Sequence, residues 1–128
     1  MSVFTAEEAR YLEERELGRL ATVGRGGLPH VVPVSYLLNR ELGTIDIGGH
    51  LMEASLKFRH VVARRVAAFV VDDVAPPYLP RSVEVRGQAE AVETPDGSLI
   101  RIHPLWVLWR GLDGTPALRR RRVELATP

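Results

Sequence analysis

The sequence predicts a mainly β domain in which an antiparallel sheet closes into a barrel. Three observations carry this prediction: a capped helix near the start, roughly five to seven short strands joined mainly by tight turns, and one helical segment inserted after the third strand. A doubly wound α/β fold is excluded because it needs a helix between most of its strands. Strands linked by turns favour a closed antiparallel barrel instead.

The composition is that of an ordinary soluble globular protein. Of 128 residues, 45% are apolar and 26% are charged, which suits one core and one domain over residues 1–128. We expect residues 113–128 to form a flexible basic tail of that domain. The formal net charge of +1 gives no reason to expect nucleic acid or an acidic membrane as a partner.

The chain contains no cysteine, which excludes disulfides, thiolate catalysis and cysteine-based zinc sites. Its first residues do not resemble a signal peptide, because glutamates at positions 7, 8, 13 and 14 stand where basic and apolar regions are required. No apolar run approaches the roughly 18 residues of a membrane span. We therefore expect a cytoplasmic protein.

The first predicted element is a helix that begins after Thr5. Thr5 and Glu8 have the spacing of a capping box, in which each side chain bonds the backbone N–H of the other residue. The helix is expected to end before Gly18.

Residues 19–23 and 29–38 are predicted as two strands of a hairpin around residues 24–27. That turn is rich in glycine, but a proline and a strand follow it, so we interpret it as a hairpin turn and not as a phosphate loop. Pro29 and Pro33 suit a strand at an edge or in an interrupted ladder, because proline has no backbone N–H to donate.

A strand at residues 44–47 breaks at Gly48 and Gly49, and a second helix follows with Ser55 as its candidate N-cap. The apolar residues with helical spacing are Leu51, Ala54, Phe58, Val61 and Val62.

Ser55, Lys57 and Arg59 at this helix start suit a phosphate. A helix start presents unpaired N–H groups and a positive dipole end, and Lys57 is the only lysine of the chain. Lys57 and Arg59 lie about 160° apart around a helix, so they can share one phosphate only if Lys57 lies in the first turn. An ordinary capped helix with its charges in solvent stays open as the alternative.

Residues 66–71 are apolar on both faces, which in a strand means two buried sides. A lone barrel would expose one of these faces, so the sequence predicts an obligate homodimer. Residues 72–80 are expected to form a loop, with Asp72 and Asp73 facing solvent or capping a turn.

Residues 82–92 alternate between apolar and polar, which predicts a long half-buried strand with Gly87 as a bend or bulge. A turn at residues 94–97 leads to two strands at residues 99–103 and 105–110. Trp106 and Trp109 are expected at an interface or a pocket. We interpret the four arginines at residues 119–122 as a solvated tail, with attraction of an anionic ligand as the alternative.

No pattern indicates a catalytic side chain. The four histidines lack metal-ligand spacing, the serines lack a nucleophile elbow, and the carboxylates form no evident acid–base pair. His60 is expected at the surface. Contact between His50 and a ligand stays open, since His50 follows two glycines.

Six segments, taken in order, resemble the pyridoxamine-phosphate-oxidase-like family of FMN-binding split barrels, and within it the deazaflavin-dependent oxidoreductase branch. The resemblance extends from about Phe4 to Trp109. The segments are residues 17–23, 29–34, 44–50, 57–59, 85–90 and 100–104.

This resemblance implies a six-stranded antiparallel split β-barrel of Greek-key topology, forming a homodimer with a cofactor in each of two interface clefts. It implies coenzyme F-420, an 8-hydroxy-5-deazaflavin, as the cofactor, with FMN as the alternative. The implied activity is transfer of a hydride to a small organic acceptor, for which the protein supplies binding and orientation.

The resemblance also implies cofactor contacts, residue by residue. They are Ser55, Lys57 and Arg59 at the phosphate; Pro33, Val34 and Ser35 on the strand whose backbone lies along the ring system; Ile47, Gly48, Gly49 and His50 in the turn beside it; and Trp109, an aromatic expected to reach the partner's site.

Two departures from the family pattern concern the substrate pocket. Leu105 and Trp106 stand where relatives are commonly basic, and residues 75–80 form a distinctive loop. Two other functions stay open: a non-catalytic flavin- or tetrapyrrole-binding protein, and a small dimeric structural barrel without cofactor.

Overall fold

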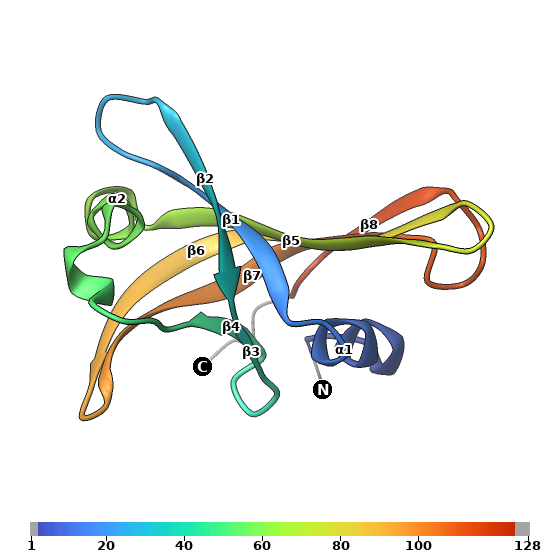
Figure 1. The fold of residues 1–128 in the computed structure, drawn as a ribbon, viewed down its shortest axis with the longest axis horizontal. Helices are drawn as coiled ribbons and strands as arrows, with labels where there is room; N and C mark the ends of the chain where they lie inside the picture. Colours follow the sequence, from blue (N-terminus) through green and yellow to red (C-terminus); the bar gives the residue numbers. More distant parts are fainter. Residues whose placement is uncertain (1–2, 125–128) are drawn as a thin grey trace.

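The computed structural model describes residues 3–124, which form a strongly curved sheet with two helices (Figure 1). The mainly β antiparallel fold is confirmed, with eight strands in these residues where the resemblance implied six. The elements are α1 (Ala6–Glu13), β1 (Leu17–Val23), β2 (Pro29–Ser35), β3 (Leu37–Asn39), β4 (Thr44–Ile47), the 3-10 turn η1 (Met52–Ala54), α2 (Leu56–Arg64), β5 (Val66–Ala75), β6 (Leu79–Thr94), β7 (Gly97–Arg110) and β8 (Leu118–Arg122).

The order of the strands closes the barrel. Hydrogen-bonded neighbours run β2-β1-β5-β6-β7-β4-β3, and β8 pairs with β7 off this path. Strands β2 and β3 thus stand at opposite ends of the sheet, yet Tyr36 alone separates them in the chain. Because the residues on either side of Tyr36 can be at most about 7 Å apart, the two ends must meet. The sheet therefore curls into a barrel that is split between β2 and β3.

Tyr36 fixes this meeting point. Its hydroxyl donates to the carbonyl of Leu12 on α1 at 2.5 Å, and its ring lies edge-on to Phe69 with the centroids 4.9 Å apart. Burial raises the pKa of Tyr36 to about 12. The single strand predicted over residues 29–38 is wrong, because the chain breaks at Tyr36 and continues on the other end of the sheet.

The core lies inside the barrel. One row of side chains crosses four neighbouring strands, each side chain at most 1% exposed: Leu20, Phe69, Val85 and Val107. Helix α1 adds Leu12, which is fully buried. Burial of each such side chain stabilises the fold by about 1.5–3 kcal/mol.

The long strands β6 and β7 shift register at Gly87, as predicted for a bulge. A Cβ at Gly87 would lie 2.0 Å from the carbonyl oxygen of His103, so only glycine fits there. The prediction of two strands at residues 99–103 and 105–110 is wrong. They form one strand through Pro104, which lies opposite Gly87, where the bulge accommodates a residue without an N–H.

Most of the loop predicted at residues 72–80 is a strand pair. Strand β5 continues to Ala75, β6 begins at Leu79, and Val74 pairs with Pro80. The prediction was wrong because it treated Pro80 as a strand breaker. The pairing of β6 with β7 begins only at Ser82, after Pro80. Pro80 therefore needs no backbone N–H on the side that faces β7.

The four arginines at residues 119–122 belong to strand β8, so the predicted tail is wrong here, although Arg119, Arg120 and Arg122 are exposed to solvent as expected. Alternation along β8 directs Arg121 inward to Glu8 and leaves Arg120 and Arg122 beside the ring of Trp106. Because all four side chains are arginine, the period of the strand does not show in the hydrophobic pattern. The rest of the predicted tail includes residues 125–128, which lie outside the described residues.

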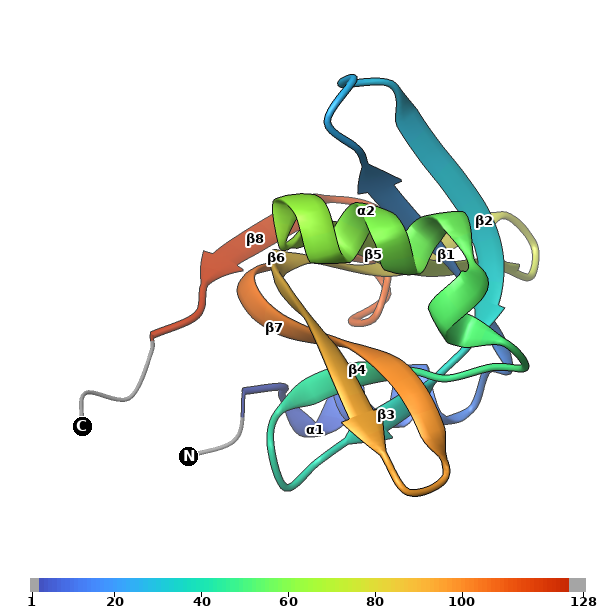
Figure 2. The same ribbon diagram turned by 90° about the vertical axis from the view of Figure 1, so that its left-hand side faces the viewer.

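Both helices begin where predicted. Glu8, 2% exposed, accepts the Thr5 backbone N–H at 3.0 Å in the capping box and two bonds from Arg121 at 2.5 and 2.6 Å. The Oγ of Ser55 accepts the N–H of Phe58 at 3.3 Å at the start of α2. Figure 2 shows α2 lying across the barrel beside β1, with the β1–β2 hairpin projecting beyond it. In residues 3–124 neither helix is long and apolar enough to cross a membrane.

Candidate functional site

The start of α2 carries the predicted phosphate segment. The hydroxyl of Ser55 donates to the Met52 carbonyl at 2.6 Å while it caps the helix. Lys57 is the second residue of α2 and is half-buried. Within residues 3–124 its ammonium makes no hydrogen bond or ion pair. A free cation thus stands in the first turn of the helix, beside its positive dipole end.

Lys57 and Arg59 lie on different sides of α2. At about 100° per residue they are about 160° apart around the helix. Arg59 instead shares its side with His60 and Ala63, and these residues face a hollow beside the turn between β1 and β2. The structure therefore places Lys57 in the first turn of α2, the position expected for a phosphate-binding lysine. Arg59 faces the hollow on another side of the helix.

Pro33, Val34 and Ser35 lie at the end of the edge strand β2. Pro33 and Ser35 are exposed, whereas Val34 is 7% exposed and offers only its backbone. In the sheet path of the described chain β2 is bonded on one side, to β1. Its other edge therefore presents unpaired backbone N–H and C=O groups.

The turn after β4 is open to its surroundings. Ile47 buries its side chain completely, while Gly48, Gly49 and His50 are exposed on the way to η1. A Cβ at Gly48 would meet no atom within 4 Å. Figure 2 shows this turn and η1 on the same side of the barrel as β2, so the structure gathers these two predicted segments and the start of α2 on one side.

Trp109 lies away from these segments. It pairs with Arg119 of β8, which lies toward the opposite end of the long axis from α2 (Figure 1). Its ring lies 5.4 Å from the guanidinium of Arg121, beside a hollow lined by Thr5 and Leu112 among others. Within one chain, Trp109 and Lys57 belong to separate places.

The histidines have varied surroundings. His60 is half-buried, with Nδ1 2.9 Å from the Thr22 hydroxyl and its ring edge-on to His30, so the expectation of a surface residue is wrong. The reason is that α2 packs this side against β1. His103 pairs with Glu90 at 2.9 Å, and His50 is exposed.

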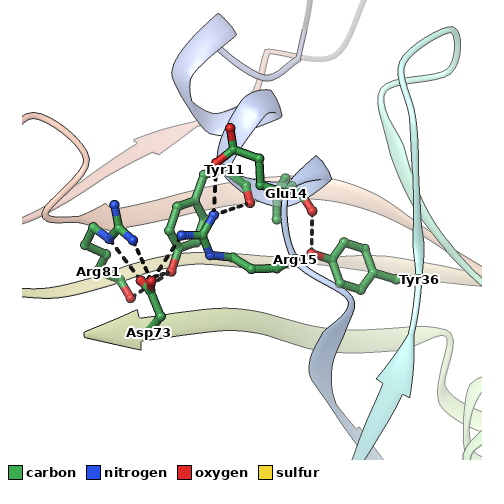
Figure 3. A network of polar contacts seen from close by, with 7 residues as sticks. Tyr11, Glu14, Arg15, Tyr36, Asp73 and Arg81 are labelled. Atoms are coloured by element: carbon green, nitrogen blue, oxygen red, sulfur yellow. Dashed lines mark hydrogen bonds and ion pairs between the residues drawn. The ribbon is translucent and has the colours of Figure 1, made fainter. Parts of the chain in front are cut away.

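A polar network joins α1 to β5 and β6 (Figure 3). Asp73 accepts bonds from Arg81 at 2.5 and 3.0 Å, from the Tyr11 hydroxyl at 2.8 Å and from Arg15 at 3.0 Å. The Arg81 bonds hold the pKa of Asp73 well below its usual range, and burial raises the pKa of Tyr11. The expectation that Asp73 faces solvent or caps a turn is wrong, because α1 and β6 supply partners distant in sequence.

A second enclosed carboxylate is Asp46 on β4. It accepts two bonds of 3.1 Å from Arg101, one from Asn39 at 3.0 Å and one from Thr44 at 2.8 Å. Burial alone raises the pKa of Asp46, but these hydrogen bonds outweigh burial and lower it. Asp46 and Asp73 thus stay ionised and bound to structural partners. In residues 3–124 no three potential metal ligands gather at one point.

Arg25 is the residue that sequence reasoning missed. It is exposed in the turn between β1 and β2 and lies on the rim of the same hollow as Arg59. In the sequence, Arg25 is marked only as an arginine among glycines, a pattern that is as typical of a solvated turn as of a binding site.

Comparison with known proteins identifies relatives of this chain. The profile of the pyridoxamine 5'-phosphate oxidase family matches residues 4–119. A 5a,11a-dehydrotetracycline/5a,11a-dehydrooxytetracycline reductase from Streptomyces rimosus is 43% identical over 121 residues, covering 87% of this chain and 85% of that protein.

Two solved structures share the fold. An FAD-binding protein from Mycobacterium smegmatis matches with a TM-score of 0.65 at 19% identity, over 95% of this chain and 99% of that one. A haem-binding protein from the same organism matches with a TM-score of 0.71 at 19% identity, over 91% of this chain and 57% of that one. At such identity the likeness concerns the fold alone.

Proposed function

The chain belongs to the pyridoxamine 5'-phosphate oxidase family and is an oxidoreductase, and from this premise we propose that it uses coenzyme F-420 to reduce a small conjugated organic molecule. The observation that carries the proposal is Lys57, a half-buried ammonium without a partner in the described chain, in the first turn of α2. The reductase from Streptomyces rimosus supports an acceptor of the same kind, a multi-ring conjugated compound.

The residues present fit a deazaflavin or flavin. The phosphate end of such a cofactor needs a cation and N–H donors, which Lys57 and the helix start behind Ser55 provide. The pyrimidine edge of the ring carries its own N–H and C=O groups, and the free edge of β2 offers complementary ones. Val34 and Ile47 keep their side chains in the core, so their backbone can lie close to a flat ring.

When bound, the cofactor supplies the hydride. Lys57 and the free edge of β2 would hold the two ends of the cofactor, and the exposed turn at residues 48–50 would leave room for an acceptor. Hydride transfer needs closeness and alignment of the reacting atoms, about 3–3.5 Å apart, and no dedicated protein acid. The accompanying proton can come from water on the open side.

A homodimer would complete the site. On β5, Ala67, Phe69 and Val71 are buried inside, whereas Val66 is 46% exposed and its outward neighbour Val70 is only half-buried. This outward apolar face needs a cover, and a second copy of the chain is the cover we propose. In such a pair Trp109 of one chain could serve the site of the other.

Light scattering at micromolar concentration tests the dimer. We expect twice the chain mass of 14.2 kDa. A clean monomer that still binds cofactor would rule out a site shared between two chains.

Titration with coenzyme F-420 and with FMN, followed by fluorescence, tests the cofactor. We expect tighter binding of coenzyme F-420 and steady-state reduction of a conjugated acceptor by the reduced cofactor. Binding of FMN alone would indicate an FMN-dependent enzyme. Binding without turnover would indicate a carrier of a flavin or a tetrapyrrole, and no uptake of either cofactor would contradict the proposal.

A further inference from the structure

We propose that the hollow between the β1–β2 turn and α2, called the turn hollow below, is a second anion-binding site for a phosphate or carboxylate group. Its volume is about 330 Å³. It is lined by Arg25 and Leu28 from the hairpin and by Leu56, Arg59, His60 and Ala63 from α2, in addition to two glycines of the turn.

The charged side chains that line the turn hollow are all positive. Arg25 and Arg59 are exposed, and within residues 3–124 neither guanidinium has a hydrogen bond or an ion pair. No aspartate or glutamate is among the lining residues. Two free guanidinium groups without a competing carboxylate suit a planar or tetrahedral oxyanion, which arginine can bind through two parallel N–H bonds.

The rim of the turn hollow is held in place by Arg64. Its guanidinium donates to the carbonyls of Gly24 at 3.2 Å and Arg25 at 2.9 Å. The turn closes on itself through the N–H of Gly27, which donates to Gly24 at 3.0 Å. These bonds occupy backbone acceptors at the rim and fix the position from which Arg25 extends. A fixed rim lowers the entropy that binding must overcome.

His60 forms the contact between the turn and the helix. A Cβ at Gly24 would lie 2.8 Å from the His60 ring, so the turn packs directly on the imidazole. The ring itself is held by Thr22 at 2.9 Å and by His30, with ring centroids 5.8 Å apart. The arrangement is therefore a packed junction between hairpin and helix, with its free cations at the outer edge.

The turn hollow is separate from Lys57. Arg59 is among the residues that line it and Lys57 is not, and the two lie about 160° apart around α2. The anion at the turn hollow is therefore either a second anionic group of an extended cofactor or a free anion. The first source rests on the proposed function, and the second does not.

Inorganic pyrophosphate is the probe that tests the site. It is titrated by calorimetry at low ionic strength into a Lys57→Gln variant, so that the start of α2 contributes little. We expect saturable binding that weakens at least tenfold when Arg25→Gln and Arg59→Gln are added. The double variant Arg10→Gln and Arg120→Gln is the matched control, since it also removes two charges, and both arginines are exposed, on α1 and β8, away from α2 (Figure 1); we expect less than a twofold change.

Absence of binding would overturn the proposal, and so would equal weakening by the control, because the effect would then come from net charge. Repeating the titration at saturating coenzyme F-420 or FMN identifies the source. Loss of pyrophosphate binding with either cofactor assigns the turn hollow to the cofactor, and retention with both assigns it to a free anion. If neither cofactor binds to the wild-type chain while arginine-dependent pyrophosphate binding persists in the variant, the proposed function fails and the site stands.

Discussion

The two ends of the molecule use their cations in opposite ways. At the end where α1 meets β5, β6 and β8, Arg81 and Arg121 are bound to Asp73 and the buried Glu8. At the end where α2 meets the β1–β2 hairpin, Lys57 and Arg59 have no carboxylate partner in the described chain. The number of cations at either end therefore indicates little about function. Their pairing separates charges that hold elements together from charges available to a ligand.

Breaking the paired end should have the largest effect. Arg121→Met leaves the Glu8 carboxylate buried without its cation, and we expect a loss of about 3–5 kcal/mol in the free energy of unfolding. Urea denaturation followed by circular dichroism measures it. Arg120→Met on the same strand is the control, since Arg120 is exposed, and should cost less than about 1 kcal/mol. Equal losses would mean that the Glu8 pair adds nothing specific.

Asp73→Asn tests the same end through pH. The pKa of Asp73 lies below its ordinary value in the folded protein, so its contribution is complete above about pH 4 and is lost as pH falls through the folded value. We expect a loss of about 1–3 kcal/mol at pH 7 and a flatter decline in stability below pH 4. Urea unfolding from pH 2 to 7 measures both. Parallel pH profiles of variant and wild type would contradict this role.

Lys57→Ala probes the unpaired end. We expect cofactor binding to weaken by about 1–3 kcal/mol, the range for hydrogen bonds to charged groups. The free energy of unfolding should change by less than about 0.5 kcal/mol, because Lys57 has no partner in the described chain. Fluorescence titration and a thermal melt give the two values. An unchanged affinity would show that Lys57 only faces solvent.

The smallest effects should come from the histidines. Substitution of His30, His50 or His103 by alanine should leave the hydride step within about tenfold, or 1.4 kcal/mol of barrier. The reason is that a hydride passes to an electron-poor acceptor without a protein acid. Single-turnover kinetics at saturating acceptor measure the step. A thousandfold loss at His50, with both ligands still bound, would reveal a general acid.

Features with nearby determinants could be predicted from the sequence. Thr5 with Glu8, and Ser55 with Phe58, are three residues apart, and each pair caps its helix. Gly87 was predicted as a bend because it interrupts an otherwise regular alternation. The cap at Ser55 also placed Lys57 in the first turn of α2, which is the part of the candidate site that sequence could locate.

Contacts between distant positions could not be predicted in this way. Glu8 and Arg121 are 113 residues apart, and Tyr11 and Asp73 are 62 apart, so no window of periodicity contains either pair. The turn hollow was missed for the same reason. Its rim depends on how α2 packs against the β1–β2 hairpin, and Arg64 gives no sign of that contact in its own segment.

The single residue between β2 and β3 also limits how the barrel can move. Tyr36 joins the two ends of the sheet and is bonded to Leu12, so the seam is closed at that point and has no such link where the β1–β2 hairpin projects. Only three residues of β1, from Arg19 to Ala21, pair with β5. A rotation of the hairpin about Tyr36 would have to break the bonds from Arg64 on α2 to the carbonyls of Gly24 and Arg25. Because β1 and β2 pair along their whole length, such a rotation would carry Arg25 and the free edge of β2 together.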